Sequence, residues 1–400
     1  MSDVEAQYEA YPYPERDPAD EAKRLIVGSP SHPVELDHYL FAGRRDWTRP
    51  FRALVAGGGT GDALIQLAQV LVSAGRTAEI TYLDLSTASR RIAEARAVAR
   101  GLSNIEFHTA SLLDARSFGD FDYIDCCGVL HHLPDPQAGF DALAGALAPG
   151  GGIGLMVYAP HGRSGVYPLQ SAFGRLLAGP PEDRLKAAKA IFARLPEGHP
   201  FRRNPHLGDH QVSDAGFYDL LLHSQDRPFT ITELDATLRA AGLAMTGTPN
   251  AHLYDPAPIV GEAADLSALS PLDRMALAEE LSGSIKLHVV YAAKAGEAKG
   301  RVARPGPRMI PHLRGAARQA LAQAVARSGR IPVNSALGKA HVPVPKGLAP
   351  VIARIDGRAT LEEIARAAGG DWFTLAPTWG KLSGALTAYG VLLYSGVLRR

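Results

Sequence analysis

Short apolar runs alternate with amphipathic stretches along residues 51–159. The apolar runs are typical of buried parallel strands, and they read FRALVA, EITYLDL, IEFHT, FDYIDCCGVL and IGLMVYA. The stretches between them have helical spacing, with Leu64, Leu67, Val70 and Leu71 on one face. This alternation predicts an α/β fold with a doubly wound sheet and right-handed crossovers.

Helical segments interrupt this pattern over residues 160–228, which we expect to form an insertion over the sheet. Strand and helix then alternate again from residue 229, and the run IKLHVVYAAK at 285–294 predicts the last strand. The main domain is therefore expected to span residues 50–296. Residues 1–49 are expected to form an N-terminal aromatic strap and lid.

The composition changes after Glu297, because eleven Lys and Arg residues and no acidic residue precede Asp356. Residues 297–335 are therefore predicted to be a basic linker containing a short helix at 314–329. In residues 336–400, Thr360 and Glu363 have capping-box spacing, a second helix follows at 374–390, and VLLYSGVL at 391–398 suggests a hairpin. This order predicts a small α+β, winged-helix-like domain.

Overall charge and cysteine content narrow the class of protein. The 42 basic and 41 acidic side chains give a net charge of +1, which provides no global attraction to nucleic acid or acidic membranes. Cys126 and Cys127 are adjacent in an apolar run, as expected for reduced thiols. No window reaches the roughly 18 apolar residues of a membrane span, so we expect a cytoplasmic protein without membrane partners.

The segment LVAGGGTGDAL at 54–64 is the main candidate for a nucleotide loop. A dinucleotide fingerprint would need a third glycine where Asp62 stands, and a P-loop would need Gly-Lys followed by Ser or Thr. The spacing that does fit is G-x-G-x-G at Gly57, Gly59 and Gly61, between a predicted strand and a predicted helix.

With this loop, the segments DCCGVLHHLPDP at 125–136 and LAPGGGIGLMV at 147–157 make residues 50–294 resemble the class I S-adenosylmethionine (SAM) dependent methyltransferases. The resemblance implies a seven-stranded sheet and SAM as cofactor. It also implies that Asp84, 27 residues after Gly57, accepts the ribose hydroxyls, and that Ser111 with the next backbone amide holds the adenine. Leu85, Leu112 and Cys127 complete the predicted cofactor site.

Val55 departs from the family pattern, because members often carry an acid there to hold the methionine ammonium. Asp62 is a candidate substitute, and we include it in the cofactor site. The alternative is that Asp62 only stabilises the N-terminus of the following helix through the macrodipole.

His131, His132 and Tyr158 are the candidate catalytic residues, because ligands of such sheets bind outside the carboxyl ends of the strands. For both histidines the alternative is helix capping and packing. The prolines in YEAYPYP predict an extended segment in which Tyr11 and Tyr13 either approach the sulfonium or pack on the surface.

Polar residues of the insertion could line a substrate pocket; they are His206, Asp209, His210, Asp214, His223 and Asp226. Their spacing matches no known metal-ligand motif, and we predict no metal site.

These features predict a SAM-dependent methyltransferase that acts on an O or N nucleophile of a protein or small-molecule acceptor. Methyl transfer is an in-line displacement, so a general base is needed only if the acceptor arrives protonated. The alternative is a nucleic-acid-binding protein that uses residues 298–400 and either modifies RNA or DNA or senses SAM. The segment CCGV stands where DNA amino-methylating enzymes usually carry Asn-Pro-Pro-Tyr or Asp-Pro-Pro-Tyr, which favours the first hypothesis.

Overall fold

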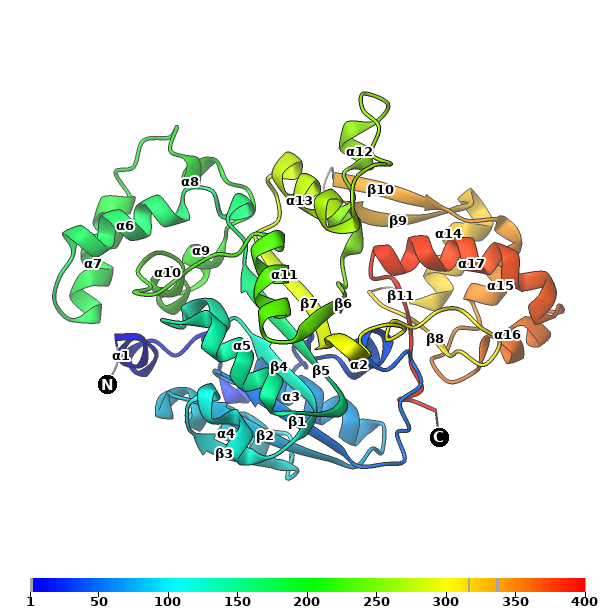
Figure 1. Ribbon diagram of the computed structural model, residues 1–400, viewed down its shortest axis with the longest axis horizontal. Coiled ribbons are helices and arrows are strands. Elements are labelled where there is room, and N and C mark those ends of the chain that lie inside the picture. Colours follow the sequence, from blue (N-terminus) through cyan, green and yellow to red (C-terminus); the bar gives the residue numbers. More distant parts are fainter. Residues whose placement is uncertain (1–2, 316, 336–337, 400) are drawn as a thin grey trace.

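A computed structural model describes residues 3–315, 317–335 and 338–399. Its centre is a seven-stranded sheet in the order β3-β2-β1-β4-β5-β7-β6 (Figure 1). The strands are β1 (Phe51–Ala56), β2 (Ala78–Asp84), β3 (Ile105–Thr109), β4 (Phe121–Cys127), β5 (Leu147–Tyr158), β6 (Leu243–Gly247) and β7 (Leu287–Lys294). The first five are parallel, and β7 runs antiparallel between β5 and β6. The predicted seven-stranded α/β fold is confirmed.

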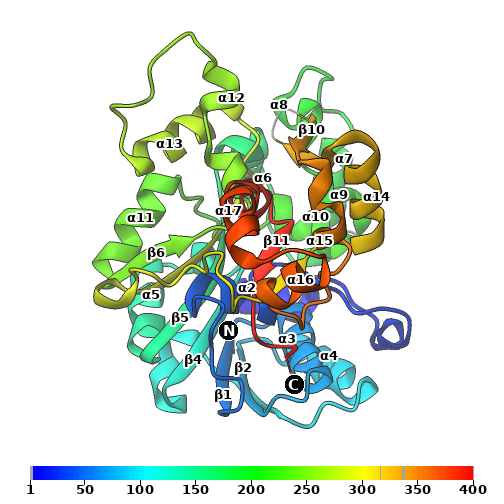
Figure 2. The same cartoon turned by 90° about the vertical axis from the view of Figure 1, so that its right-hand side faces the viewer.

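Helices cover both faces of the sheet (Figure 2). One face packs against α2 (Pro33–Leu40), α3 (Asp62–Ser73) and α4 (Thr87–Ala99), and the other against α5 (Pro136–Gly145), α11 (Ile231–Ala240) and α13 (Pro271–Ser282). Successive residues of β1 serve opposite faces, because Ala53 and Val55 join the first core and Leu54 and Ala56 the second. The buried run FRALVA therefore anchors both layers.

Residues 160–228 form short helices beside the sheet, on the left of Figure 1. They are η4 (His161–Arg163), α6 (Val166–Leu176), α7 (Pro181–Phe192), α8 (Pro200–Arg203), α9 (Asp209–Val212) and α10 (Asp214–Leu221). Their apolar faces form a separate core that includes Leu169, Phe173 and Phe217. Because this segment continues directly from β5, it lies next to the carboxyl end of that strand.

The N-terminal segment differs from its prediction, because α1 (Asp3–Ala10) is helical and includes Tyr8. The chain leaves the helix only at Tyr11, ahead of Pro12 and Pro14, so neither proline opposes a helical turn. The 3-10 helix η1 (Pro18–Ala22) follows.

Residues 297–335 also differ from the prediction, because they are not a linker. They contain β8 (Pro311–Leu313), α14 (Arg318–Ser328) and β9 (Arg330–Ser335). Leu321 and Val325 of α14 are buried in one core with Trp379 and Leu386 of the last helix. The basic side chains of this segment lie mostly on the surface, and its apolar residues are part of the domain core. The charge pattern alone did not indicate these buried apolar positions.

The rest of this C-terminal domain comprises β10 (Gly338–Pro343), η7 (Lys346–Leu348), α15 (Ala349–Ile352), α16 (Leu361–Ala367), α17 (Trp372–Ala388) and β11 (Leu392–Tyr394). The capping box of Thr360 and Glu363 is confirmed. The predicted hairpin at 391–398 is wrong, because β11 pairs with β8, placing Leu392 opposite Leu313. The β9–β10 hairpin precedes α16 and α17, so the winged-helix arrangement is not confirmed.

Between β6 and β7 the chain adds η5 (Ala251–Tyr254), α12 (Ala257–Val260) and α13. No helix within the described residues combines the length and the apolar character that a membrane span requires.

Candidate functional site

The glycine loop joins β1 to α3 in a conformation that requires glycine. Gly57 has φ +69°, and a Cβ there would lie 2.4 Å from a methyl group of Val129. Gly61, the N-cap of α3, has φ +100°. Side chains at either position would strain the turn, so the backbone presents a smooth surface at the carboxyl end of β1.

Asp84 ends β2 beside this loop. Its Oδ2 accepts a hydrogen bond from the Gly59 amide at 2.7 Å, and its Oδ1 accepts one from the Ser86 amide at 2.8 Å. Burial raises the pKa of Asp84, although these amide hydrogen bonds favour the ionised form. Each carboxylate oxygen keeps a further lone pair for a hydroxyl donor.

The other predicted cofactor residues follow adjacent strands. Ser111, after β3, caps η2 (Leu112–Phe118) by accepting the Leu113 amide at 3.2 Å. The Leu112 side chain is buried in the core, whereas that of Leu85 is exposed. Cys127 ends β4, where burial raises the pKa of its thiol and keeps it neutral. Because β3, β2, β1 and β4 are neighbours, these residues and the glycine loop lie side by side at the carboxyl ends of the four strands.

The N-terminal segment passes over the glycine loop at the carboxyl end of β1. The carbonyl oxygen of Tyr13 would lie 3.0 Å from a Cβ at Gly59, and the Pro14 carbonyl accepts a hydrogen bond from Thr60 Oγ1 at 2.7 Å. Tyr11 instead stacks on Tyr218 of α10, with ring centroids 5.1 Å apart. The structure therefore places Tyr13 at the glycine loop and Tyr11 against the insertion.

Asp62 is engaged by two arginines. Its carboxylate accepts hydrogen bonds from Arg16 Nε at 2.9 Å and Nη2 at 2.6 Å, and from Arg96 Nη1 at 2.8 Å. Burial alone would raise the pKa of Asp62, but the two guanidinium groups hold it below its usual value. The contacts of Asp62 thus tie the N-terminal segment to the start of α3.

A second group of polar residues is buried where β4 and β5 end. His131 and His132 come from η3 (Leu130–His132), Tyr158 from the end of β5, and Asp219 from α10. Tyr158 Oη donates to Asp219 Oδ2 at 3.2 Å, and the His131 ring lies 4.0 Å from that of Tyr158. The three predicted catalytic residues therefore lie together.

Residues distant in sequence complete this group. Tyr8 of α1 donates from Oη to Asp219 Oδ1 at 3.1 Å, and the His223 ring stacks on His132 with centroids 3.7 Å apart. Arg163 Nη2 donates to Asp226 Oδ2 at 3.2 Å. We call the set of Tyr8, His131, His132, Tyr158, Arg163, Asp219, His223 and Asp226 the buried polar cluster.

Sequence reasoning missed Asp219, although an acidic residue within the apolar helix GFYDLLL was a usable signal. Of the six insertion residues expected at a pocket, His223 and Asp226 join the cluster. His206 and Asp214 are exposed, and Asp214 pairs with Lys189. The spacing of charges along the insertion could not show which of them the helices turn inward.

Backbone partners determine the tautomers of two histidines. The Gln225 carbonyl can only accept, so the His132 Nδ1 atom 2.7 Å away carries a proton and Nε2 keeps a lone pair. The Gln225 amide donates to His223 Nδ1 at 3.1 Å, which leaves the proton of the neutral His223 ring on Nε2. Burial lowers the pKa of His131 and His223 and raises that of Asp219, so burial disfavours the charged form of each.

Comparisons with known proteins agree with this arrangement. Residues 54–153 match the family described as a methyltransferase domain. An uncharacterised Synechococcus protein is 32% identical over 298 residues, which are 70% of this chain and 69% of that protein. A ubiquinone biosynthesis O-methyltransferase of Paracidovorax citrulli is 33% identical over 89 residues, covering 22% of this chain and 37% of the relative.

A solved structure shares the overall fold. PKMT2 from Rickettsia typhi, in complex with AdoHcy, has a TM-score of 0.62 at 13% identity and covers 91% of this chain and 75% of its own. The likeness thus extends beyond the seven-stranded sheet into the flanking parts of the chain. Together with the matching domain family, the sheet order and the glycine loop, these comparisons lead to one assignment: the chain belongs to the class I S-adenosylmethionine-dependent methyltransferases.

Proposed function

We propose that this methyltransferase transfers the methyl group of SAM to a hydroxyl oxygen of a small-molecule acceptor. The observation that carries the proposal is the hydrogen bond between Tyr158 and the buried Asp219, within the polar cluster beside the glycine loop. A protonated oxygen nucleophile needs a base close to the methyl donor, and this pair supplies one.

The cofactor would lie across the carboxyl ends of β1, β2 and β3, against the glycine loop, Asp84 and the segment after β3. In this proposal Asp84 accepts the ribose hydroxyls, and the Ser111 hydroxyl with the Leu112 amide contacts the adenine. Leu85 and Cys127 would border the cofactor, with Tyr13 above it. Asp62 keeps its contacts with Arg16 and Arg96, so we do not assign it to the methionine ammonium.

The proton of the acceptor would leave through Tyr158. The acceptor hydroxyl would donate to Tyr158 Oη while Tyr158 passes its own proton to Asp219 Oδ2. The acceptor oxygen would then attack the methyl carbon in line as the carbon–sulfur bond breaks, and S-adenosylhomocysteine would leave as a neutral thioether. The raised pKa of Asp219 makes it a stronger base than an exposed carboxylate. Tyr8, the second hydroxyl donor to Asp219, would keep that carboxylate oriented.

The burial of the polar cluster and the likeness to known O-methyltransferases support a small-molecule hydroxyl acceptor. His131, His132 and Asp219 are each at most 6% exposed, so a large folded surface could not reach them directly. The likeness to ubiquinone biosynthesis O-methyltransferases supports oxygen as the acceptor atom. A protein acceptor would have to insert an extended side chain.

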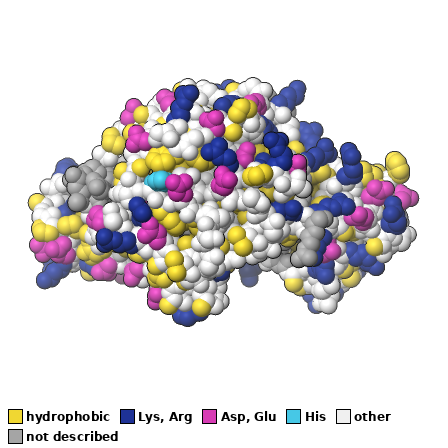
Figure 3. All heavy atoms as spheres, turned by 90° about the horizontal axis from the view of Figure 1, so that it is seen from below, with side chains coloured by type: hydrophobic (Ala, Val, Ile, Leu, Met, Phe, Trp, Pro, Cys, Tyr) yellow, Lys and Arg dark blue, Asp and Glu magenta, His cyan; other side chains and the backbone are white. Residues whose placement is uncertain are grey.

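The nucleic-acid alternative receives less support from the structure. Arg314 forms an ion pair with the buried Glu35, and Arg301 bonds Glu297 and the Gly150 carbonyl, so both hold the fold together. On the face drawn in Figure 3, Lys and Arg side chains are interspersed with acidic ones and form no continuous basic band. Phosphate binding favours a contiguous basic surface.

Asp219→Asn tests the proposed base. The variant should lower kcat by about 100-fold or more, while SAM affinity measured by calorimetry stays unchanged. In the parent enzyme kcat should fall as the pH drops through the raised pKa of Asp219, because the protonated carboxyl cannot accept a proton, and the variant should lose that limb of the profile. Asp183→Asn, an exposed acid of α7, is the matched control.

Acceptor class is tested separately, with methyl-labelled SAM and size-fractionated cell extract. Label should enter small molecules and be stable to conditions that release methyl esters. Label in protein or RNA, or a normal kcat in Asp219→Asn, would refute the proposal.

A further inference from the structure

His131 lacks the partners that a buried imidazole needs. The residue is 1% exposed, and neither ring nitrogen has a hydrogen-bond partner within the described residues. An unsatisfied buried polar atom costs about 1–3 kcal/mol, so such an atom requires an explanation. Packing and helix capping, the structural alternatives for this histidine, do not satisfy either nitrogen.

Asp226 has a similar unfilled position. Its side chain is fully buried, and Oδ2 accepts from Arg163 at 3.2 Å and from Gln170 at 3.0 Å. Oδ1 is buried and has no partner within the described residues. Arg163 thus neutralises Asp226 from one side and leaves the other oxygen free.

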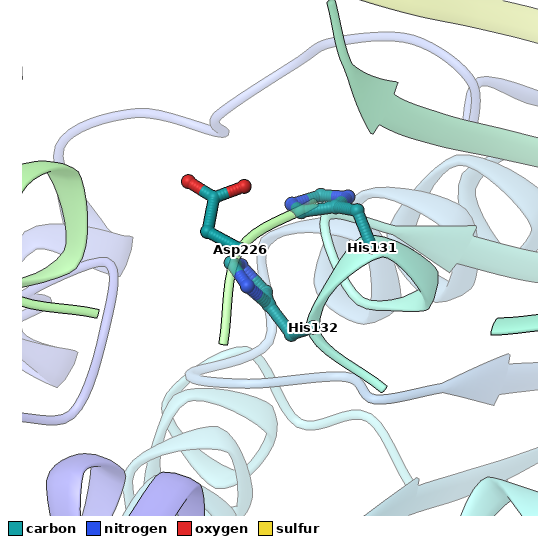
Figure 4. A group of neighbouring side chains, drawn as sticks. All are labelled: His131, His132 and Asp226. Carbon is teal, nitrogen blue, oxygen red and sulfur yellow. The ribbon is translucent and has the colours of Figure 1, made fainter. Parts of the chain in front are cut away.

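These free atoms converge with His132. Ligand atoms of His131, His132 and Asp226 lie within 4.8 Å of one another, and Figure 4 shows the ring of His131 with one nitrogen turned toward the carboxylate of Asp226. His132 contributes the lone pair on Nε2, because Nδ1 donates to Gln225. All three side chains therefore offer electron pairs to the same small space, and a cation meets that requirement.

A neighbouring set satisfies the distance criterion but not the chemistry. His132, Asp219 and His223 also have ligand atoms within 4.8 Å of one another. However, the neutral His223 ring carries its proton on Nε2, since Nδ1 accepts from Gln225, and both oxygens of Asp219 already accept from tyrosines. In this second set Asp219 and His223 already have hydrogen-bond partners, whereas His131 and Asp226 Oδ1 have none within the described residues.

We propose that His131, His132 and Asp226 bind a divalent transition-metal cation that holds the acceptor oxygen. Two imidazole nitrogens and one carboxylate oxygen suit Zn²⁺, Fe²⁺, Co²⁺ or Mn²⁺, whereas Mg²⁺ and Ca²⁺ prefer oxygen ligands. Three protein ligands leave coordination positions open for a substrate oxygen.

This inference rests on the proposed oxygen methylation and gives its acceptor a more specific chemistry. A hydroxyl bound to the cation ionises more readily, because the positive charge stabilises the oxyanion. Its proton passes through Tyr158 to Asp219 as described above, so the cation and the base act on the same bond. An acceptor with a second hydroxyl adjacent to the first could fill two coordination positions.

Binding of Co²⁺ to the untagged full-length protein tests the site without any acceptor. One equivalent should bind, with visible absorption bands of a nitrogen- and oxygen-ligated ion. His131→Gln and Asp226→Asn should weaken Co²⁺ binding by at least about 10-fold. His161→Gln, an exposed histidine after β5, should bind as the parent does.

His223→Gln distinguishes the proposed set from the neighbouring set that contains His223. The variant should retain Co²⁺ affinity if the cation lies between His131, His132 and Asp226. Asp226→Asn could disturb the fold through Arg163, so His131→Gln with an unchanged melting temperature is the decisive variant. Equal Co²⁺ affinity in parent and His131→Gln would overturn the proposal, as would loss of binding in His223→Gln alone.

Co²⁺ binding and methyl transfer, measured separately, distinguish the two levels of the proposal. Absence of a metal site with methyl transfer intact would refute only the cation. A cation site in a protein that methylates no hydroxyl compound would refute the proposed function and leave the site standing.

Discussion

Asp125 is an acidic residue at the centre of the sheet, and it is only 1% exposed. The hydroxyls of Ser31 and Tyr123 donate to its Oδ2 at 2.7 and 3.0 Å, but burial outweighs them and raises its pKa to about 6. An acid whose pKa is higher in the folded state contributes stability at low pH, below its unfolded value, and loses it as the pH rises through the folded value.

Asp125→Asn should therefore stabilise the protein at pH 8 by up to about 3 kcal/mol, because the amide removes a buried charge and keeps an acceptor for the two hydroxyls. The advantage should shrink as the pH falls from 6 to 4. Chemical denaturation at several pH values measures it, and a variant less stable than the parent at pH 8 would contradict the prediction.

Asp84 is the residue on which the proposed cofactor binding most depends. Asp84→Ala should weaken SAM binding by about 10- to 100-fold, which corresponds to losing one or two hydrogen bonds to a charged group. Calorimetric titration with SAM measures the change. Glu79→Ala, an exposed acid on the same strand, should bind normally, and unchanged affinity in Asp84→Ala would place the ribose elsewhere.

At the scale of elements, the N-terminal segment joins the two halves of the site. Glu9 accepts from Ser86 and from the Ala88 amide at the start of α4, Tyr8 reaches Asp219, and Arg16 holds Asp62. Side-chain hydrogen bonds and the stacking of Tyr11 on Tyr218 therefore attach this segment to the domain. Such an element is expected to open at lower free energy than the sheet does.

Arg16→Ala should release this segment without unfolding the domain. Hydrogen exchange of residues 6–16 should accelerate to an extent equivalent to about 1–3 kcal/mol, because a bidentate pair at roughly one-third exposure is lost. Lys23→Ala removes a pair that is mostly exposed and should have no measurable effect. Unchanged exchange in Arg16→Ala would show that the remaining contacts suffice.

At the scale of the whole molecule, α2 joins the C-terminal domain to the sheet. Asp37 accepts from Trp47 at 3.0 Å, from Ser395 Oγ at 2.7 Å and from the Gly396 amide at 3.0 Å. The adjacent His38 accepts the Tyr394 amide at 3.0 Å. Residues 394–396 are therefore part of the core, and deleting residues 298–400 would leave buried groups of α2 without partners.

Asp37→Ala should destabilise the whole protein by about 3 kcal/mol or more, because three buried donors lose their acceptor. Calorimetry should show one transition shifted to lower temperature. Two separate transitions, with only the smaller one shifted, would mean that the C-terminal domain folds independently.

The sequence by itself predicted the sheet, because strands of this type are continuous apolar runs and the intervening helices carry an apolar face. The run FRALVA is β1, the run FDYIDCCGVL contains β4, and the glycine spacing at Gly57, Gly59 and Gly61 indicated the turn between β1 and α3. These features depend on neighbours a few residues apart, so local periodicity is sufficient to reveal them.

Charge and proline patterns were less reliable guides. A run without acidic residues suggested a linker at 297–335, yet its apolar positions are buried in the C-terminal core. The prolines after Tyr11 suggested an extended strap, yet the preceding residues are helical. In both places a conspicuous residue type obscured the hydrophobic spacing beside it.

Only the tertiary structure decided the composition of the site. Tyr8, His131, Tyr158, Asp219 and Asp226 come from five separate parts of the chain, and no spacing in the sequence relates them. Whether Asp62 faced a cofactor or an arginine depended on Arg16, which is 46 residues away. Helix and strand patterns follow from local geometry, whereas hydrogen-bond partners and buried charges follow from how distant segments pack, and that information appears only when the chain is folded.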